Sequence, residues 1–400
     1  MRSKKVLILS SYGGYGHIAA SNTLIDLLGD EWEATVIYPI NDLRFWGAPK
    51  GESFYNFLLS NNLIRIANAC VKYITPSLFR DRSIHRAQAL IERELQEVKP
   101  DLLISVIPFI NLPASEAARA LNIPFLLVTT DNDLKNWVLK IDRFNHPNYK
   151  VTIGGDMPTT RGALESKKIP SERIETIGLP LRPHFSREYD KEQMREKRGI
   201  EGSRKVVLVM LGGMGSRATY KYARSIAKLK LGVHLILCTG KNRSLARRLK
   251  RLKIAEGNTL DIVPFTERIH ELMALSDVLI TKPGPGTINE AVALRLPILI
   301  DQIDTTLFWE QVNIDMVRQH KIGGCIRSLS EIEATLKSYL FDENLRAELV
   351  AAFDLLPSNR FASAIQKTID DLCGFPAEEM QQREVGVLHK KSSTFPSIQV

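Results

Sequence analysis

The chain has 400 residues, more than one hydrophobic core usually organises, so two domains are expected. Its hydrophobic content of 44% and charged content of 25% are those of an ordinary globular protein and exclude a disordered or fibrous one. The formal net charge of +9 admits nucleic acid, an anionic membrane surface or phosphorylated substrates as partners, and charge does not rank them.

Targeting signals and cysteine spacing also limit the class of protein. The longest apolar runs, such as residues 102–110, are too short to span a membrane. The basic N-terminus is followed by only four apolar residues, 6–9, which predicts a first strand and not a signal peptide. Four scattered cysteines without metal or disulfide spacing fit a reducing cytosol. These features predict a cytoplasmic protein.

The first half begins with a predicted strand, a glycine turn and a helix, over residues 6–10, 11–17 and 18–28. Gly14 and Gly16 fit the G-x-G-x-x-G/A pattern of dinucleotide-binding domains. That pattern also needs an acidic residue at the end of the second strand, to hold the adenosine ribose. The second predicted strand, 34–38, ends without one, so a dinucleotide site is only weakly supported.

Residues 54–79 combine aromatic and aliphatic side chains with cations and almost no acids. This composition is typical of a segment that lies in a membrane surface. An ordinary pair of core helices is the alternative, and the composition does not decide between them.

Alternating strands and helices continue through the chain, which is typical of α/β proteins. Further strands of the first half are expected over 101–107, 125–130, 150–154 and 174–177. Those of the second half are expected over 206–211, 233–238, 259–263, 277–280 and 296–300. A turn-rich linker, 178–183, lies between the two sets. The sequence therefore predicts two Rossmann-like domains over 1–185 and 186–374, followed by a flexible tail over 375–400.

Two such domains leave a cleft between the carboxyl edges of their sheets, where ligands of open α/β sheets bind. The glycine turn after the first strand is repeated after residue 211, with glycines at Gly212, Gly213 and Gly215. We therefore expect one site, built by glycine turns from both halves.

The strongest motif is Thr281-Lys282-Pro283-Gly284-Pro285-Gly286-Thr287-Ile288-Asn289-Glu290-Ala291, between a predicted strand and a predicted helix over 287–294. Gly284 and Gly286 let the backbone approach a ligand closely, and the helix N-terminus offers free N–H groups to a diphosphate. Glu290 lies one turn into the helix, where it can accept hydrogen bonds from ribose hydroxyls. A glycine-capped helix with a solvated Glu290 is the alternative.

A basic helix is expected over 242–253, and the stretch from Lys241 contains no acidic residue until Glu256. Each cation near an anionic leaflet contributes roughly 1 kcal/mol. Nucleic acid is disfavoured because this helix lacks aromatic residues for base stacking. A solvated helix face is the alternative to membrane binding.

By the 281–291 motif, the chain resembles the monogalactosyldiacylglycerol synthase and diacylglycerol glucosyltransferase family, whose motif is T-K-x-G-P-G-T-I-x-E-A. Three shorter stretches are similar to other family motifs: Gly13-Gly14-Tyr15-Gly16-His17, Tyr55-Asn56-Phe57-Leu58 and Gly178-Leu179-Pro180-Leu181-Arg182-Pro183. The resemblance runs from about Val6 to Leu372. More distantly, the chain is similar to the N-acetylglucosaminyltransferase that makes lipid II. These are inverting enzymes of the GT-B fold, glycosyltransferase family 28-like, that use nucleotide sugars.

The resemblance implies roles for individual residues. Gly284, Gly286 and Thr287 would hold the diphosphate, and Glu290 the uridine ribose. The remaining positions would surround the donor: Gly14 and Gly16 in the first turn, Gly212, Gly213 and Gly215 near the phosphates, the backbone of Phe265 at the uracil, and Glu310 and Asn313 at the sugar. Lys282 precedes the phosphate turn and could pair with it, and a solvated lysine is the alternative.

The chain departs from the family at two places. The family has G-Q-E-x-x-N before its sugar-reading helix, whereas this chain has Trp309 in place of the glutamine. The family also places a histidine after Asp131, and this chain continues with Asn132 and Asp133. Both departures concern the surroundings of the donor sugar.

Transfer with inversion needs a base on the acceptor hydroxyl and positive potential on the leaving diphosphate. His17, at the end of the first glycine turn, is the first candidate base, since histidine titrates near neutral pH. Asp131 could orient His17 or be the base itself. A histidine that only shapes the turn and a capping aspartate are the alternatives. No metal is expected, because Asp131-Asn132-Asp133 matches the D-x-D pattern only superficially.

These expectations describe an enzyme at the inner face of a membrane. It would transfer a hexose from UDP-galactose, or secondly UDP-glucose, to diacylglycerol, with the UDP-sugar as co-substrate and no tightly bound cofactor. An anionic membrane surface is expected as a partner, and nucleic acid is not. A non-hydrolysing nucleotide-sugar 2-epimerase of the same fold is one alternative. A non-catalytic relative that binds nucleotide or membrane is another.

Overall fold

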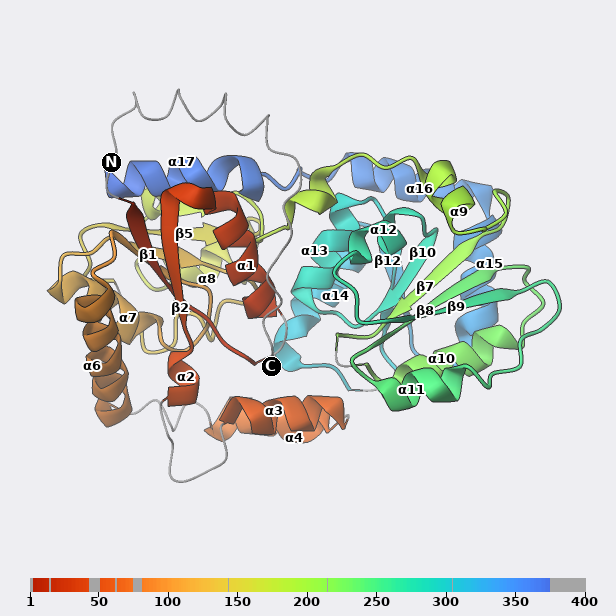
Figure 1. Cartoon of the computed structure of the whole chain (residues 1–400), viewed down its shortest axis with the longest axis horizontal. Helices are drawn as coiled ribbons and strands as arrows, with labels where there is room; N and C mark the ends of the chain where they lie inside the picture. Colours follow the sequence, from red (N-terminus) through yellow and green to blue (C-terminus); the bar gives the residue numbers. More distant parts are fainter. Residues whose placement is uncertain are drawn as a thin grey trace.

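The computed structural model describes residues 3–13, 16–42, 51–61, 63–74, 81–142, 144–213, 215–303 and 305–374. Gly14 and the predicted tail over 375–400 lie outside these ranges. Two six-stranded parallel sheets, each flanked by helices, lie side by side (Figure 1). The prediction of two Rossmann-like α/β halves is confirmed.

The first sheet has the strand order β2-β1-β3-β4-β5-β6. Its strands are β1 (Lys4–Leu9), β2 (Trp32–Ile37), β3 (Leu102–Ser105), β4 (Phe125–Val128), β5 (Tyr149–Ile153) and β6 (Ile174–Thr176). Around it lie α1 (Gly16–Leu28), η1 (Gly29–Glu31), α2 (Pro39–Asp42), α6 (Asp81–Val98), α7 (Asn111–Ala120), α8 (Arg161–Glu165) and η3 (Ser171–Arg173). The central strands β3 and β4 are buried throughout, as expected for a parallel sheet covered on both faces.

The second sheet has the strand order β12-β11-β10-β7-β8-β9. Its strands are β7 (Val206–Met210), β8 (His234–Gly240), β9 (Thr259–Pro264), β10 (Val278–Thr281), β11 (Ile298–Asp301) and β12 (Gly323–Ile326). The helices of this half are η4 (Pro183–Ser186), α9 (Lys191–Lys197), α10 (Arg217–Ala227), α11 (Arg243–Leu249), α12 (Ile269–Ala274), α13 (Pro285–Ala293), η5 (Phe308–Glu310), α14 (Gln311–Gln319), η6 (Leu329–Glu331), α15 (Ile332–Phe341) and α16 (Glu343–Asp354).

Two details of the second half differ from the prediction. The basic helix α11 ends at Leu249, so Arg251 and Lys253 lie beyond it. Strand β12 was not expected, because it begins with two glycines, which are poor strand formers. A Cβ at Gly323 would lie 1.9 Å from the carbonyl oxygen of Ile298, so this position of the edge strand accepts only glycine.

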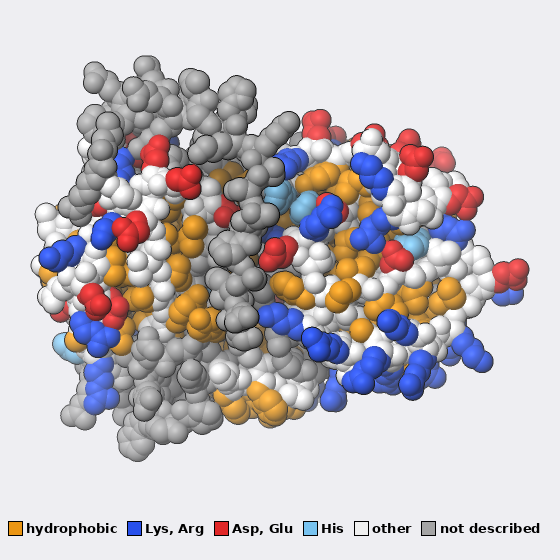
Figure 2. Space-filling view, in the orientation of Figure 1, with side chains coloured by type: hydrophobic (Ala, Val, Ile, Leu, Met, Phe, Trp, Pro, Cys, Tyr) orange, Lys and Arg blue, Asp and Glu red, His pale blue; other side chains and the backbone are white. Residues whose placement is uncertain are grey.

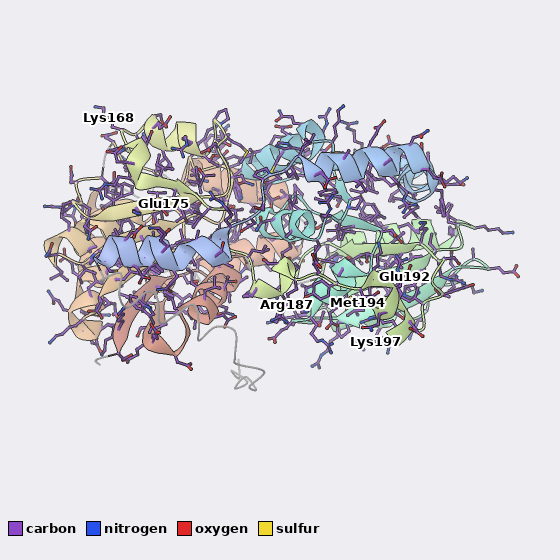
Figure 3. The ribbon with its side chains drawn as sticks, turned by 90° about the horizontal axis from the view of Figure 1, so that it is seen from above. Lys168, Glu175, Arg187, Glu192, Met194 and Lys197 are labelled. Carbon is purple, nitrogen blue, oxygen red and sulfur yellow. The ribbon has the colours of Figure 1, made fainter. Side chains whose placement is uncertain are left out.

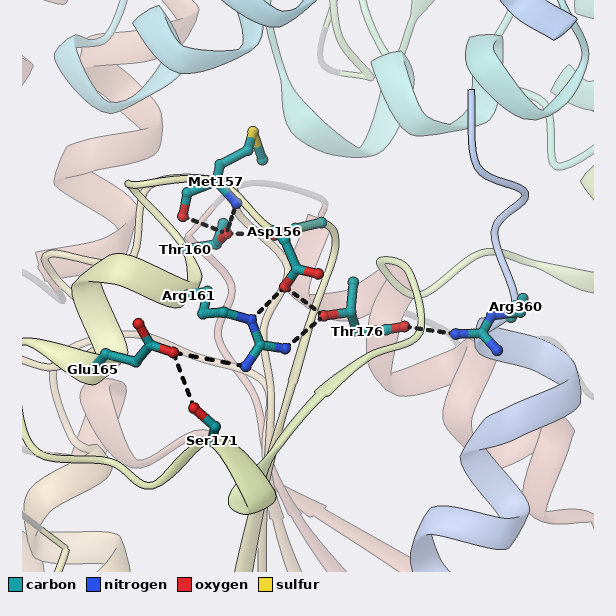
Figure 4. A network of polar contacts seen from close by, with 9 residues as sticks. Asp156, Met157, Thr160, Arg161, Glu165, Ser171, Thr176 and Arg360 are labelled. Atoms are coloured by element: carbon teal, nitrogen blue, oxygen red, sulfur yellow. Dashed lines mark hydrogen bonds and ion pairs between the residues drawn. The ribbon is translucent and has the colours of Figure 1, made fainter. Parts of the chain in front are cut away.

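The last helix, α17 (Phe361–Cys373), belongs to the first core although the sequence assigned it to the second half. Its buried face, which includes Phe361, Ile365 and Ile369, packs with side chains of the first sheet. Figure 3 shows α17 along the first half beside Glu175, which accepts a hydrogen bond from Thr368. At the helix start, Arg360 Nη2 donates to the Thr176 carbonyl at 3.1 Å (Figure 4). The chain thus crosses between the halves twice.

The predicted interfacial segment forms α3 (Gly51–Ser60), α4 (Ile64–Ala69) and a π-helical turn, η2 (Cys70–Ile74). Its inner face packs Leu58, Ile64 and Ala67 against Leu307 of the second half. Its outer face exposes apolar side chains, namely Phe54, Phe57, Leu63, Ile66 and Tyr73. The segment is therefore apolar on both faces, and its inner face bridges the two halves. Within the described ranges, no helix combines the length and apolar character that crossing a bilayer requires.

Candidate active site

His17 lies in the first turn of α1, at the carboxyl edge of the first sheet. Its Nδ1 is 2.8 Å from the Val106 carbonyl oxygen, which can only accept, so Nδ1 carries the proton. Thr130 Oγ1 lies 3.2 Å from the same nitrogen. In this tautomer Nε2 holds the lone pair, which is the state that a general base requires.

Asp131 follows β4 and lies beside His17. Its Oδ2 accepts a hydrogen bond from Trp137 Nε1 at 3.0 Å. Burial raises the pKa of Asp131, and the charge of His17 opposes that rise. Burial lowers the pKa of His17, and the charge of Asp131 opposes that fall. Burial therefore favours a neutral imidazole at rest, and the charge of Asp131 stabilises the imidazolium once His17 takes up a proton.

Glu310 reaches the same region from the second half. Its Oε1 lies 3.8 Å from the point where a Cβ on Gly284 would stand, so it adjoins the predicted phosphate turn. Burial raises the pKa of Glu310 to about 7, Lys282 opposes this shift, and the charge of Asp131 adds to it. Because the charge of Asp131 acts on Glu310, these two predicted site residues lie near each other across the two halves.

The two glycine turns of the second half lie next to each other because β10 and β7 are paired, with Thr281 opposite Met210. Gly284 caps α13, and a Cβ on Gly286 would meet no described heavy atom within 4 Å. At Gly215 a Cβ would lie 2.1 Å from the Thr239 carbonyl oxygen, and φ is +78°. Gly212 also has a positive φ, +101°. These conformations favour glycine and bring backbone close to the edge where a diphosphate is predicted.

Glu290 is not a solvated residue, since its side chain is only 18% exposed. Its Oε1 accepts a hydrogen bond from Arg182 Nη2 at 2.9 Å. Burial raises the pKa of Glu290, and the Arg182 guanidinium opposes this shift. Phe265, predicted to meet the uracil through its backbone, follows β9 and donates its N–H to the Gly240 carbonyl at 3.0 Å. The Phe265 side chain is exposed, with Lys241 over its ring.

Asn313 is buried at the start of α14, and its side-chain amide is fully engaged. Its Oδ1 accepts from Asn132 Nδ2 at 2.9 Å, and its Nδ2 donates to the Pro283 carbonyl at 2.8 Å. In this conformation Asn313 therefore joins the halves and supports the phosphate turn. Its contact with a donor sugar stays a prediction.

Tyr55, on α3, lies near the candidate site residues Glu310 and Asp131, although the sequence pattern gave it no role. Burial raises its pKa, and the charges of Glu310 and Asp131 raise it further. Its ring centroid lies 6.5 Å from that of Trp309. Trp309, the departure from the family motif, thus packs against the segment that bridges the halves. Tyr55 belongs to the Y-N-F-L motif, and this motif was the feature of the sequence that could have indicated a role for Tyr55 at the site.

The two outer acids of Asp131-Asn132-Asp133 have local partners. Asp133 Oδ1 accepts from the backbone N–H of Lys135 at 3.1 Å, as Asp131 does from Trp137. In the part of the chain that the structure describes, no group of three or more His, Cys, Asp and Glu side chains is arranged to hold a metal ion.

Comparison with known proteins shows which families the chain resembles. Residues 206–300 match the glycosyltransferase family 28 C-terminal domain. A processive diacylglycerol beta-glucosyltransferase of Bacillus pumilus is 28% identical over 74% of this chain and 77% of its own length. The chloroplastic monogalactosyldiacylglycerol synthase of Spinacia oleracea is 28% identical over 84% of this chain and 66% of its own length.

Solved structures show the same fold at lower sequence identity. Acinetobacter baumannii MurG aligns with a TM-score of 0.59 at 15% identity, over 91% of this chain and 99% of its own. The spinosyn rhamnosyltransferase SpnG aligns with a TM-score of 0.57 at 13% identity, over 91% and 99%. The predicted GT-B fold is confirmed. The second half carries a glycosyltransferase family 28 C-terminal domain, and the chain is a glycosyltransferase related to the diacylglycerol glucosyl- and galactosyltransferases.

Proposed function

We propose that this glycosyltransferase moves a hexose from a UDP-sugar to the hydroxyl of diacylglycerol, with UDP-galactose as the first candidate donor and UDP-glucose as the second. The related proteins that are named for diacylglycerol support the acceptor. The UDP-sugar serves as co-substrate, and no tightly bound cofactor is proposed.

The observation that carries this proposal is the meeting of His17 and Asp131 with Glu310 and the phosphate turn across the two halves. His17 Nε2 removes the proton from the acceptor hydroxyl, and that oxygen attacks the anomeric carbon of the sugar. The bond to the diphosphate breaks on the opposite face, and the UDP carries away the electron pair. Free N–H groups at the start of α13 and the Lys282 ammonium stabilise the charge that forms on UDP.

The lipid acceptor places the enzyme at a membrane, and we propose that it binds the inner, anionic leaflet. The exposed apolar face of α3 and α4 lies near the helices α10 and α11, where Lys and Arg side chains gather (Figures 1 and 2). On α10, Arg217 and Lys221 are four residues apart, and Arg224 has the same spacing to Lys228, which directly follows the helix. Such like-charge pairs repel on a helix, and an anionic surface offsets that repulsion.

The proposal is tested by incubating the protein with radiolabelled UDP-galactose, and separately UDP-glucose, on diacylglycerol liposomes that contain anionic lipid. Labelled glycolipid from one donor identifies the sugar. His17→Gln should lose turnover by about 10²-fold or more while it keeps its affinity for UDP. His320→Gln, at an exposed position outside the site, is the matched control and should stay active. No product from either donor would overturn the proposed acceptor.

A further inference from the structure

Arg182 connects two parts of the proposed nucleotide site, although it lies in the linker and not in the second domain itself. Its Nη2 donates to Glu290 Oε1 at 2.9 Å. Its Nη1 donates to the Glu267 carbonyl oxygen at 3.3 Å. Its guanidinium carbon lies 4.9 Å from the ring centroid of Phe185. One planar side chain is thus fixed by a carboxylate, a backbone carbonyl and an aromatic face.

The two hydrogen-bonded partners belong to stretches with different proposed roles in the nucleoside site. Glu290 is the residue proposed for the ribose, and Glu267 is two positions after Phe265, whose backbone is proposed for the base. Only an arginine can hold both partners at once, because its donors diverge in a fixed plane whereas lysine offers a single point of charge. Glu290 Oε1 is engaged by Arg182, which leaves Oε2 as the oxygen available to ribose hydroxyls.

A charged residue of the first half also lies near Arg182. Asp26, on α1, interacts electrostatically with both His184 and Arg182. His184 stacks on His270 of α12, with ring centroids 4.7 Å apart. Burial lowers the pKa of His184, and it lowers that of His270 to about 4, so charge on the two rings is disfavoured. Arg182 is the cation that opposes the raised pKa of Glu290.

We propose that Arg182 is a positioning residue of the donor site: it aims the Glu290 carboxylate and the backbone after Phe265 at the ribose and base of a nucleoside diphosphate. This inference rests on the proposed use of a UDP-sugar. Because Arg182 belongs to the linker, the nucleotide site is pre-organised by the segment that also sets the orientation of the two halves.

Removal of Arg182 has a consequence beyond lost packing. Burial already favours the protonated form of Glu290, and without the guanidinium its pKa rises further. A protonated Glu290 accepts fewer hydrogen bonds from ribose. The pH at which acid begins to weaken UDP binding should therefore be higher in a variant without the guanidinium than in the wild type.

The test is calorimetric titration of the full-length protein with UDP and with 2′-deoxy-UDP at pH 6, 7 and 8. We expect the wild type to prefer UDP. In Arg182→Gln, UDP affinity at pH 7 should fall roughly tenfold, as expected when a charge-assisted hydrogen bond is lost. The preference over 2′-deoxy-UDP should shrink, and the loss of UDP affinity in acid should begin at a higher pH than in the wild type. Arg182→Lys should keep the pH profile of the wild type but bind UDP more weakly.

Two further variants keep the test decisive. Arg187→Gln removes an exposed arginine five residues along and should behave as the wild type. In a Glu290→Gln background, Arg182→Gln should change the ribose preference little, because the two residues act as one unit.

If the wild type does not bind UDP, the proposed function itself fails. If it binds UDP and Arg182→Gln leaves preference and pH profile unchanged, the role of Arg182 is wrong while the function stands. A misfolded Arg182→Gln is replaced by Arg182→Lys, whose unchanged affinity would equally refute the role.

Discussion

Asn132 and Asn313 share a hydrogen bond of 2.9 Å across the two halves of the protein, although 181 positions separate them in the chain. Both side chains are buried, and Asn313 also donates to the Pro283 carbonyl just before the phosphate turn. Asn132 follows Asp131 directly. The side-chain amide of Asn313 therefore links the residue next to Asp131, a candidate catalytic residue, to the phosphate turn.

Asn313→Ala should lower the free energy of unfolding by about 1–3 kcal/mol, because it leaves the amide of Asn132 and the Pro283 carbonyl unsatisfied. It should also weaken UDP binding, since the turn loses a support. Urea denaturation and UDP titration measure both effects. Asn145→Ala, at an exposed position, should change stability by less than about 0.5 kcal/mol. Equal effects of the two substitutions would contradict the bridging role.

A pair of glycine substitutions separates folding from ligand binding. Gly215→Ala should disrupt the fold locally, because its Cβ would stand 2.1 Å from a carbonyl oxygen at positive φ. Gly286→Ala meets no described atom within 4 Å and lies inside α13. It should keep or slightly raise the thermal midpoint, as alanine is the better helix former by about 1 kcal/mol. UDP affinity should still fall, because the methyl group occupies the approach of the diphosphate. Unchanged UDP affinity in Gly286→Ala would place the diphosphate elsewhere.

The buried carboxyl of Glu310 should make stability depend on pH. Its pKa is about 7 in the fold against an ordinary value of 4.5, so its contribution is present below pH 4.5 and is lost as the pH rises through 7. Above pH 8 the ionised carboxylate should cost about 3 kcal/mol. Glu310→Gln should therefore be more stable than the wild type at pH 8 and nearly equal near pH 5, measured by urea unfolding. Glu333→Gln, a half-exposed residue, should show no such difference between the two pH values.

The pH profile of kcat/KM should distinguish the two candidate bases. Burial lowers the pKa of His17, so with His17 as base the acidic limb should lie below the ordinary value of 6.5. Asp131→Asn removes a charge that raises that pKa, and the limb should move to still lower pH with activity retained. Complete loss of activity in Asp131→Asn, together with an active His17→Gln, would instead make Asp131 the base.

Membrane binding should depend on the exposed face of α3. Phe57 is 56% exposed, and Phe57→Ser should reduce sedimentation with anionic liposomes several-fold, since a partly inserted aromatic side chain is lost. Leu355→Ser is the matched control, because Leu355 follows α16 and is 87% exposed. Higher salt should weaken binding if the cations of α10 and α11 contact the leaflet. Equal losses in both variants would point to nonspecific adsorption.

The sequence by itself determined the two α/β halves, the order of every strand except β12, and the glycine turn between β10 and α13. These features are local: buried parallel strands appear as apolar runs, and a glycine turn before a helix is visible within a dozen residues. The glycines of the second half and Glu290 could be singled out for this reason, and the structure places Glu290 in a buried ion pair with Arg182.

Only the tertiary structure decided what meets across the halves. The return of α17 to the first core, the bridge from α3 to Trp309 and the contact between Arg182 and Glu290 join residues that are distant in sequence. No local periodicity encodes such pairs, because they arise from the way in which distant elements pack in space. The raised pKa of Glu310 likewise follows from burial at that junction, which a linear sequence does not display.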